Sequence, residues 1–386
     1  MSAILRWGRD AHTTMKHLVL LGAGHAHVHV LEGLAARRPV NLRITLIAPQ
    51  REQLYSGMVP GFVADHYTLG HCVIALDGLL ARCGANFVPG SAASINADAR
   101  TLTLEGGQTI AWDWLSLNTG AVMDRQKIEA TMPGARANAL FVRPIEAFAK
   151  LWPQVAGMAA QRPVHLAVVG AGAAGLELAM AAAHALGQPH NTPGSRVTLV
   201  TGGAAPGQSY PVSVQRRIRA ALKRLHITVL QDTCVGVNAF EVMLGGGATL
   251  VCNLPLLTIG AQAPPWLAGS GLALDAQGFV QVNSCQQSTS HVQVFAAGDM
   301  ASRADLPHSR SGVYAVRAGP PLLRNLMAAI ASQPLTPYAP PGRTLNLLSC
   351  GSRYAIAVWG PLSVEGRWVW TLKDRIDRKF VRRYSH

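Results

Sequence analysis

The residues with the clearest chemical meaning are three glycines, Gly170, Gly172 and Gly175. They follow an apolar run of strand length at residues 166–169 and precede an alanine-rich stretch of helix length. Such a loop lets the backbone approach a pyrophosphate closely and donate N–H groups to it at the start of a helix. The spacing therefore predicts that this segment binds a dinucleotide, rather than forming a glycine-rich turn without function.

A related loop lies near the start of the sequence, where Gly22 and Gly24 follow a short apolar run. His27 stands at the third glycine position, and we expect this change to loosen the contact between strand and helix. His25, His27 and His29 are spaced two apart, which is compatible with a metal site, but no cysteine stands beside them. We therefore favour packing of His25 and His27 at the helix start, near the phosphates of a dinucleotide, over metal binding.

Neither loop is followed by the acidic residue that often binds a ribose 2′-hydroxyl at the end of the next strand. Pro49 occupies this region after the first loop, and Thr201 occupies it after the second. Because no carboxylate stands there to repel a 2′-phosphate, the second loop is compatible with both NADH and NADPH. Arg216 and Arg217 could pair with that phosphate, or they could form an exposed helix face.

Around the two loops, strand-like and helix-like segments alternate, which indicates parallel sheets in an α/β fold. The order of strand, glycine loop, helix and strand occurs twice, and turn residues around Gly106 predict antiparallel hairpins between the copies. We expect a strand within residues 292–299 and a helix over residues 312–330. A proline-rich connector at 333–343 then leads to two strand-like runs and a final amphipathic segment.

The composition excludes several classes of protein. A length of 386 residues with 49% hydrophobic and 14% charged residues allows two or three well-buried domains. The net charge of +14 favours anionic ligands and surfaces, but no specific nucleic-acid-binding module is recognisable. We find neither an export signal nor a transmembrane span, and expect a cytoplasmic protein or one held peripherally on the inner face of a membrane. The six cysteines lack C-x2-C or C-x4-C spacing, so isolated thiols are expected.

Four motifs follow one another in a specific order, at residues 22–24, 118–121, 170–177 and 296–299. In this order the sequence resembles the two-dinucleotide-domain flavoproteins of the pyridine nucleotide–disulfide oxidoreductase superfamily, which includes type II NADH dehydrogenases and sulfide:quinone reductases. A closer resemblance, to the flavoprotein domain often fused to selenide, water dikinase, is carried by residues 55–61, 312–317 and 370–378. It does not extend to the dikinase part, so selenophosphate synthesis is not implied.

The resemblance implies two Rossmann-like dinucleotide-binding domains, with the NAD(P) domain inserted in the FAD domain, plus a small C-terminal α+β region. An FAD-binding domain would comprise residues 16–125 and 286–335. The NAD(P)H-binding domain would comprise residues 126–285. The C-terminal region, residues 336–386, would end in a basic amphipathic tail.

The resemblance also implies roles for single residues near the flavin. Asp299 would accept hydrogen bonds from the ribityl chain of FAD, and Gly298 would let the flavin approach. Tyr55 and Ser56 would pass near the isoalloxazine ring. Glu177 would lie between nicotinamide and flavin, although it could equally be a partly exposed helix residue.

Two further positions would form crossovers between the domains. Thr119 and Gly120 would mark the point where the chain leaves the FAD domain. Gly260 would mark its counterpart after the NAD(P) domain.

The activity that the resemblance implies is an FAD-dependent NAD(P)H oxidoreductase, in which hydride passes from nicotinamide to flavin N5 and electrons pass on to a small acceptor. A disulfide acceptor would require paired thiols, which the sequence lacks, so we expect a quinone. Two alternatives stay open. One is a non-catalytic flavin-binding redox partner or sensor linked to selenium metabolism, and the other is a sulfide:quinone reductase-like enzyme that would use Cys350.

The C-terminal segment carries Trp368, Leu372, Ile376 and Phe380 four residues apart, so they would share one face of a helix. Cations surround this stripe. It could contact a membrane peripherally and admit a lipid-soluble quinone. Alternatively, it could dock on the protein's own body or on a second copy in a homodimer.

Overall fold

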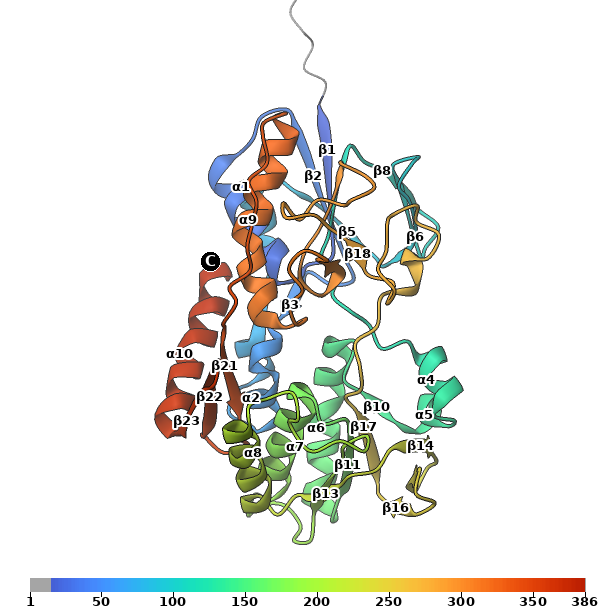
Figure 1. Ribbon diagram of the computed structural model, residues 1–386, viewed down its shortest axis with the longest axis vertical. Helices are drawn as coiled ribbons and strands as arrows, with labels where there is room; N and C mark the ends of the chain where they lie inside the picture. The colour runs from blue at the N-terminus through green and yellow to red at the C-terminus, as the bar shows by residue number, and fades with distance from the viewer. Residues whose placement is uncertain (1–14, 386) are drawn as a thin grey trace, which may run out of the picture.

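The structure is a computed structural model that describes residues 15–385. The sequence of residues 1–15 predicts a loose extension, and apart from Met15 these residues lie outside the described part of the chain. Two parallel sheets, one above the other in Figure 1, form the centres of the two halves of the molecule. The prediction of an α/β fold with two parallel-sheet, Rossmann-like cores is confirmed.

The first sheet has the strand order β19-β9-β1-β2-β5, and all neighbouring strands are parallel. Its strands β1 and β9 are apolar and buried, as expected where both faces of a parallel sheet are covered. Helices α1 and α9 pack closely on one another beside it. The bounds are β1 (Lys16–Leu21), α1 (His25–Arg37), β2 (Leu42–Ala48), β5 (Asn86–Pro89), β9 (Trp114–Leu117), β19 (Val294–Ala296) and α9 (Gly312–Ile330).

The second sheet has the order β10-β17-β11-β12-β13, again parallel throughout. All of its strands fall between β9 and β19 in the sequence, so the second half is inserted into the first. Its elements are β10 (Leu140–Phe141), α6 (Ile145–Gln161), β11 (His165–Val169), α7 (Ala173–Leu186), β12 (Arg196–Val200), α8 (Val212–Arg224), β13 (Thr228–Leu230) and β17 (Leu254–Leu257).

Each half also carries a three-stranded antiparallel sheet, which strengthens the case for internal duplication. The first comprises β6 (Ala92–Asn96), β7 (Thr101–Leu104) and β8 (Thr109–Ala111), and the second comprises β14 (Cys234–Val237), β15 (Glu241–Leu244) and β16 (Thr249–Val251). The turn between β7 and β8 contains Gly107 with φ +83°, a conformation that favours glycine. The predicted hairpin is therefore confirmed.

Smaller elements connect and flank the sheets. They are β3 (Glu52–Leu54), α2 (Val59–Val63), β4 (Val73–Ala75), α3 (Asp77–Cys83), α4 (Arg125–Thr131), α5 (Ala135–Asn138), β18 (Val280–Gln281) and β20 (Ala301–Ser302), with 3-10 turns at Ser56–Met58, Leu69–Cys72, Pro265–Leu267 and Gly298–Met300.

The C-terminal region differs from the sequence-based expectation of two strands. It has three antiparallel strands, β21 (Leu345–Ser349), β22 (Ala355–Trp359) and β23 (Leu362–Gly366), followed by helix α10 (Arg367–Tyr384). The third strand, β23, is short, and its alternating apolar residues Leu362 and Val364 are exposed rather than buried. None of the helices between residues 15 and 385 is long and apolar enough to cross a membrane.

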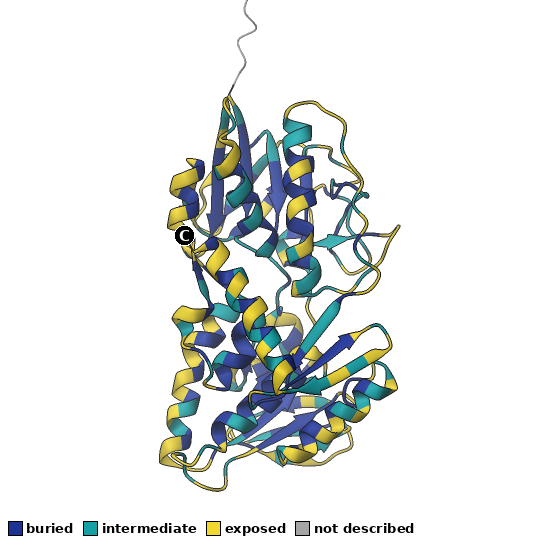
Figure 2. Cartoon of the chain, turned by 90° about the vertical axis from the view of Figure 1, so that its left-hand side faces the viewer, coloured by how far each residue is buried: buried dark blue, intermediate teal, exposed yellow. Residues whose placement is uncertain are grey.

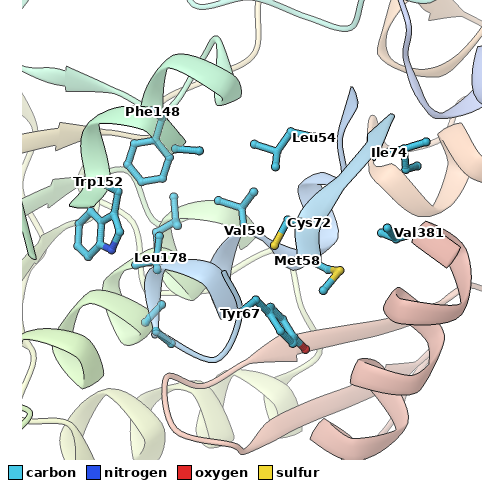
Figure 3. Packing of buried hydrophobic residues seen from close by; sticks show 14 of the residues in the cluster. Leu54, Met58, Val59, Tyr67, Cys72, Ile74, Phe148, Trp152, Leu178 and Val381 are labelled. Atoms are coloured by element: carbon cyan, nitrogen blue, oxygen red, sulfur yellow. The ribbon is translucent and has the colours of Figure 1, made fainter. Parts of the chain in front are cut away.

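One hydrophobic core joins the halves to the C-terminal region. Figure 3 shows Met58 and Tyr67 of the first half near Leu178 of α7 and Val381 of α10. Phe148 on α6 belongs to the same cluster and is fully buried. Because this core draws on all three parts, the two sheets are held together by shared apolar packing rather than by a linker alone.

Candidate functional site

The first glycine loop connects β1 to α1 and is crossed by the chain that leaves β9. A Cβ atom added at Gly22 would lie 2.6 Å from the carbonyl oxygen of Asn118, and one at Gly24 would lie 2.4 Å from that oxygen. Gly22 also has φ +90°, which side chains rarely adopt. The crossing chain therefore explains the requirement for both glycines.

The side chain of Asn118 connects this loop to the chain segment that follows β19. Its Oδ1 accepts hydrogen bonds from the backbone N–H groups of Ala26 (3.1 Å) and His27 (3.2 Å), and its Nδ2 donates to the Ala297 carbonyl at 2.8 Å. The backbone N–H of Gly24 donates to the Asn118 carbonyl at 3.1 Å. Asn118 thus fixes the start of α1 to the motif that contains Gly298.

The imidazole of His27 fills the position of the third glycine. It is fully buried, with Nδ1 2.5 Å from the Gly22 carbonyl and Nε2 2.8 Å from the Ser116 hydroxyl. A carbonyl can only accept, so Nδ1 carries the hydrogen and Nε2 accepts from Ser116. Burial lowers the pKa of His27 to about 4, so the ring is neutral. Hydrogen bonds of His27 therefore connect the turn to β9, whereas a glycine at this position would let the helix and the strand pack directly on one another.

The three spaced histidines do not converge. His25 lies beside Tyr55, with ring centroids 5.2 Å apart, whereas His29 has Nδ1 3.2 Å from the Tyr384 hydroxyl. Burial lowers the pKa of His25 to about 4. Residues 15–385 contain no group of three or more His, Cys, Asp or Glu that could hold a metal ion.

Gly298 and Asp299 lie next to the first loop, as the motif order requires. Gly298 has φ +66°, and a Cβ there would lie 2.9 Å from Asn118 Nδ2. Asp299 Oδ2 accepts from Arg143 Nη2 at 3.3 Å, and Arg143 Nη1 donates to the Ala121 carbonyl at 2.9 Å. Arg143 follows β10 of the second half, so it links the crossover at Gly120 to the carboxylate of the first half.

Thr119 and Pro49 complete the candidate residues on this edge. The exposed Thr119 donates through Oγ1 to the sulfur of Met300 at 3.1 Å. Pro49 is exposed directly after β2, at the carboxyl edge of the first sheet.

Tyr55 and Ser56 contact both the first loop and helix α10. Ser56 Oγ lies 3.4 Å from His25 Nε2. The ring of Tyr55 stacks on Phe380 with centroids 4.5 Å apart, and its hydroxyl donates to Asp377 Oδ1 at 3.3 Å. The Tyr55 segment therefore lies between the loop and the C-terminal helix.

Helix α10 turns a charged pair inward. Lys373 and Asp377 are only 8% and 5% exposed, and Lys373 Nζ donates to Asp377 Oδ2 and to the Gly57 carbonyl, both at 2.6 Å. Burial raises the pKa of Asp377, while Lys373 opposes that rise. Burying such a pair is costly unless hydrogen bonds satisfy both groups, as they do here.

The predicted stripe of α10 is only partly docked on the body of the protein. Trp368 and Ile376 are 59% and 43% exposed, whereas Phe380 packs on Tyr55. In Figure 2, which faces the side carrying α10, the helices show mixed exposed and buried faces. The face that packs inward is one residue further round the helix, and it includes Val369, Lys373, Asp377, Val381 and Tyr384.

Glu177 lies on α7, two residues beyond the second glycine loop. Its Oε1 accepts from the Ser349 N–H at 2.8 Å, at the end of β21. Burial raises the pKa of Glu177, and the nearby positive charge of Lys373 opposes this shift. Glu177 therefore faces the C-terminal region. The charge of Lys373 influences its pKa, and Lys373 in turn contacts the segment that follows Tyr55.

The second glycine loop connects β11 to α7 and is packed more openly. A Cβ at Gly175 would lie 1.9 Å from the Gly170 carbonyl oxygen, so glycine is required there. By contrast, Gly172 is exposed and a Cβ would meet no atom within 4 Å. Thr258 Oγ1 donates to the Val169 and Gly170 carbonyls at 2.9 and 3.1 Å, and the exposed Gly260 follows two residues later.

Both loops fit a dinucleotide pyrophosphate, with different numbers of available donors. Within the described chain, the N–H groups of Ala173, Ala174 and Gly175 donate to no protein atom. At the first loop only those of Ala23 and His25 are left, because Ile47 engages the N–H of Gly22 and Asn118 engages those of Gly24, Ala26 and His27. Neither helix has an acidic residue in its first turn that would repel phosphate.

Residues 201–203, at the edge that would meet the second ribose, carry no charged side chain. Thr201 donates to the Ala204 carbonyl at 2.5 Å, and the N–H groups of Gly202 and Gly203 donate to the Asp232 carbonyl. Arg217 instead pairs with Glu365 of β23. Arg217 is therefore committed to the C-terminal region, which disfavours its alternative role at a 2′-phosphate.

The six cysteines, all within the described residues, are free. Cys350 is fully buried and burial raises its pKa to about 12, with the negative charge of Glu177 adding to the shift. A thiol in this state is a poor nucleophile.

Sequence reasoning missed the side chains of Asn118, Ser116, Arg143, Lys373 and Asp377. Asn118 stood inside a recognised motif, but its partners are 91 or more residues away in sequence. Lys373 and Asp377 lie in the segment that the sequence predicts to be a basic amphipathic tail, which gave no sign that they would be buried. Their spacing of four residues was the signal that could have placed them on one face of the helix.

Comparison with known proteins places these features in a family context. Residues 16–321 match the family model described as pyridine nucleotide-disulphide oxidoreductase. The chain is 24% identical to oxidoreductase ptaL of Pestalotiopsis fici, covering 94% of this chain and 96% of that protein. It is 25% identical to the demethylphylloquinone reductase NdbB of Synechocystis, covering 75% and 74%. The solved structure of NDH2 from Plasmodium falciparum in complex with NADH shares the fold, with a TM-score of 0.79 at 12% identity and coverage of 96% and 97%.

Proposed function

The chain belongs to the pyridine nucleotide-disulphide oxidoreductase family, and from this membership we propose that it is an FAD-dependent NAD(P)H oxidoreductase that reduces a quinone. The oxidoreductase activity and the use of FAD and NAD(P)H follow from the family and its named relatives. The quinone is the proposed part. The observation that carries it is the position of α10 between the two glycine loops: its Lys373 donates to the Gly57 carbonyl beside Tyr55 and lies close enough to Glu177 to influence its pKa.

We assign FAD to the first loop and NAD(P)H to the second. In this assignment residues 16–125 and 286–335 form the FAD-binding domain and residues 126–285 the NAD(P)H-binding domain. Residues 336–386 form the C-terminal region. The insertion of all strands of the second sheet between β9 and β19 supports these boundaries.

When bound, the two cofactors supply the redox chemistry itself, a hydride transfer to flavin N5 and onward transfer of electrons. The protein binds and orients them. In our proposal Asp299 accepts hydrogen bonds from the ribityl chain, with Arg143 orienting its carboxylate at 3.3 Å. Gly298 keeps the space beside it free of a side chain.

Reduction of a quinone to a quinol consumes protons as well as electrons, and Glu177 is placed to hold one. Its Oε1 is engaged by the Ser349 N–H, so a proton would reside on Oε2. Burial raises its pKa, which brings proton uptake and release closer to neutral pH. Lys373 moderates that rise through its positive charge.

Two observations support a quinone over other acceptors. NdbB, a relative at 25% identity, is named a demethylphylloquinone reductase. Reduction of a disulfide would require a pair of reactive thiols, whereas the six cysteines here are free and Cys350 is fully buried. The burial of Cys350 also argues against the sulfide-oxidising alternative.

We further propose that α10 brings the protein to a membrane surface, where lipid-soluble quinones reside. Trp368 and Ile376 are exposed on this helix, and a cationic groove beside them is lined by Thr371, Asp374, Arg375, Arg378, Lys379, Arg382 and Arg383. Exposed aromatic and aliphatic groups flanked by cations favour an anionic bilayer surface.

The suggested kinship with the flavoprotein domain fused to selenide, water dikinase also remains a proposal. The three segments that carry it meet in space. Tyr55 hydrogen-bonds Asp377, and a Cβ at Gly312 would lie 3.7 Å from Ser56 Oγ. The three segments therefore lie together near the first loop.

Anaerobic stopped-flow mixing tests the proposed function. Purified protein should show a flavin absorbance spectrum that is lost on mixing with NADH or NADPH and regained on mixing with a quinone. A flavin that neither nicotinamide reduces would overturn the enzyme and favour a sensor. A reduced flavin that reoxidises with ferredoxin or sulfur species, and not with quinones, would overturn the proposed acceptor.

A further inference from the structure

Two fully buried polar side chains behind the first loop have no part in the proposed redox steps. His27 is 0% and Asn118 is 2% exposed. Buried polar groups are destabilising unless hydrogen-bonded, and both residues have two or more hydrogen-bond partners within 3.2 Å. Such complete satisfaction indicates that they define the shape of the loop.

Asn118 controls which donors the loop can offer. The first backbone N–H groups of a helix have no partner within the helix and normally serve an anion or a cap. Here Asn118 Oδ1 takes those of Ala26 and His27, and its carbonyl takes that of Gly24. The donors left toward an anion are the N–H groups of Ala23 and His25.

His27 controls the path of the turn itself. Its Nδ1–H holds the carbonyl of Gly22, the residue with φ +90°, and its Nε2 is held by Ser116 of β9. The first turn of the loop is therefore anchored to the neighbouring strand through a side chain. At the second loop the equivalent position is Gly175, and Thr258 supplies the cross-strand hydrogen bond.

We propose that His27 and Asn118 are positioning residues for the pyrophosphate of FAD. They hold the loop in its binding shape and restrict the pyrophosphate to the N–H groups of Ala23 and His25. This inference rests on the proposed assignment of FAD to the first loop.

The physical consequence is a loop that is ordered before the cofactor arrives. Fixing a loop in its bound shape removes the entropic cost of ordering it on binding, and so slows cofactor release. The first loop then suits a resident cofactor, although it offers fewer donors than the second.

The test compares His27→Leu with His27→Gln in the purified holoprotein. Leucine is similar in size and makes no hydrogen bonds, whereas glutamine can donate to one partner and accept from the other. We expect His27→Leu to weaken FAD binding by about tenfold or more, which corresponds to about 1.4 kcal/mol, and His27→Gln to restore most of it. FAD dissociation is followed by the rise in free flavin fluorescence.

Phosphorus NMR of the bound FAD reads the pyrophosphate directly. Asn118→Ala should shift its two phosphorus signals, because the N–H groups of Ala26 and His27 become available to the phosphates. Thr258→Val, the matched change at the second loop, should leave these signals unchanged and should weaken NADH binding instead.

Three outcomes would overturn the inference. They are unchanged FAD affinity in His27→Leu, equal losses in the leucine and glutamine variants, and unchanged phosphorus signals in Asn118→Ala. Failure of the proposed function is separate, because it would appear in the unmutated protein as absence of FAD or as flavin that no nicotinamide reduces.

Discussion

The two glycine loops show how one backbone motif can be stabilised in opposite ways. The second loop has all three glycines and exposes Gly172, Ala173 and Ala174 to solvent. The first lacks the third glycine, and its helix start is buried and capped by Asn118. The comparison teaches that a complete glycine pattern marks an open loop with free donors, whereas a degenerate pattern can mark a loop that side chains have closed.

The open second loop would suit a cofactor that exchanges, and the first loop, which side chains hold in place, would suit a cofactor that stays bound. A free and exposed donor set allows rapid entry and departure of a nicotinamide. A loop with a fixed shape favours slow release. The four predictions below test whether the two loops behave as independent sites.

The largest expected effect is a loss of stability on changing Lys373, which connects α10 to the Tyr55 segment through the Gly57 carbonyl. Lys373→Met would leave Asp377 buried without its partner, which should destabilise the protein by about 3–5 kcal/mol. Thermal unfolding measures the loss, and Lys379→Met, an exposed change on the same helix, is the control. Adding Asp377→Leu should recover much of the stability. If Lys373→Met unfolds at the same temperature as Lys379→Met, the stability of the protein does not depend on the contacts of Lys373 with Asp377 and Gly57.

Gly175→Ala should break the second loop selectively. The new Cβ would meet the Gly170 carbonyl oxygen at 1.9 Å, so the backbone must shift at an overpacking cost of about 1–3 kcal/mol. NADH affinity should fall by roughly tenfold or more while FAD stays bound. Gly157→Ala on α6, where a Cβ meets nothing within 4 Å, is the matched change for stability. Loss of FAD together with NADH would contradict independent sites.

Mild acid should affect the first loop before the second, because residues 170–177 contain no histidine. The folded pKa of His27, about 4, lies below its ordinary value of 6.5. Its contribution to stability is therefore complete above pH 6.5 and is lost as the pH falls from 6.5 toward 4. At pH 5.5 the loss should be on the order of 1 kcal/mol. Urea unfolding at pH 7.5 and 5.5 measures it, and His27→Gln should reduce that difference without abolishing it, because burial also lowers the pKa of His25 to about 4.

The last prediction concerns the choice of nicotinamide. Thr201→Glu places a carboxylate where a ribose 2′-phosphate would lie, and should lower NADPH affinity relative to NADH by about tenfold. Thr201→Gln matches the size without the charge and should change the ratio little. Equilibrium titration with each dinucleotide gives the ratio. An equal ratio in both variants would place the 2′-position elsewhere.

Local sequence patterns were sufficient for much of the fold. The apolar run before Gly170 and the alanine-rich stretch after it predicted β11 and α7, and the helix over 312–330 was predicted with its observed bounds. These features depend on neighbours a few residues away. Glycine spacing and periodicity report such neighbours directly.

The features that escaped prediction depend on distant partners. Nothing near Asn118 indicates that its amide will meet Ala26 and Ala297, since only the parallel pairing of β9 with β1 and β19 brings them together. On α10, the amphipathic rule places charges outward, but the carbonyl of Gly57 and the hydroxyl of Tyr55 provide an inward environment that satisfies Lys373 and Asp377. A single sequence does not encode that environment locally.

The split first sheet sets an order of assembly during synthesis. Every strand of the second sheet has been synthesised once Leu257 has been added, so pairing within this sheet needs no strand from later in the chain. The first sheet must wait for Val294–Ala296, because β19 is its edge strand beside β9. The half that we assign to the visiting nicotinamide can thus fold first, and it can serve as a surface on which the unfinished flavin half is completed.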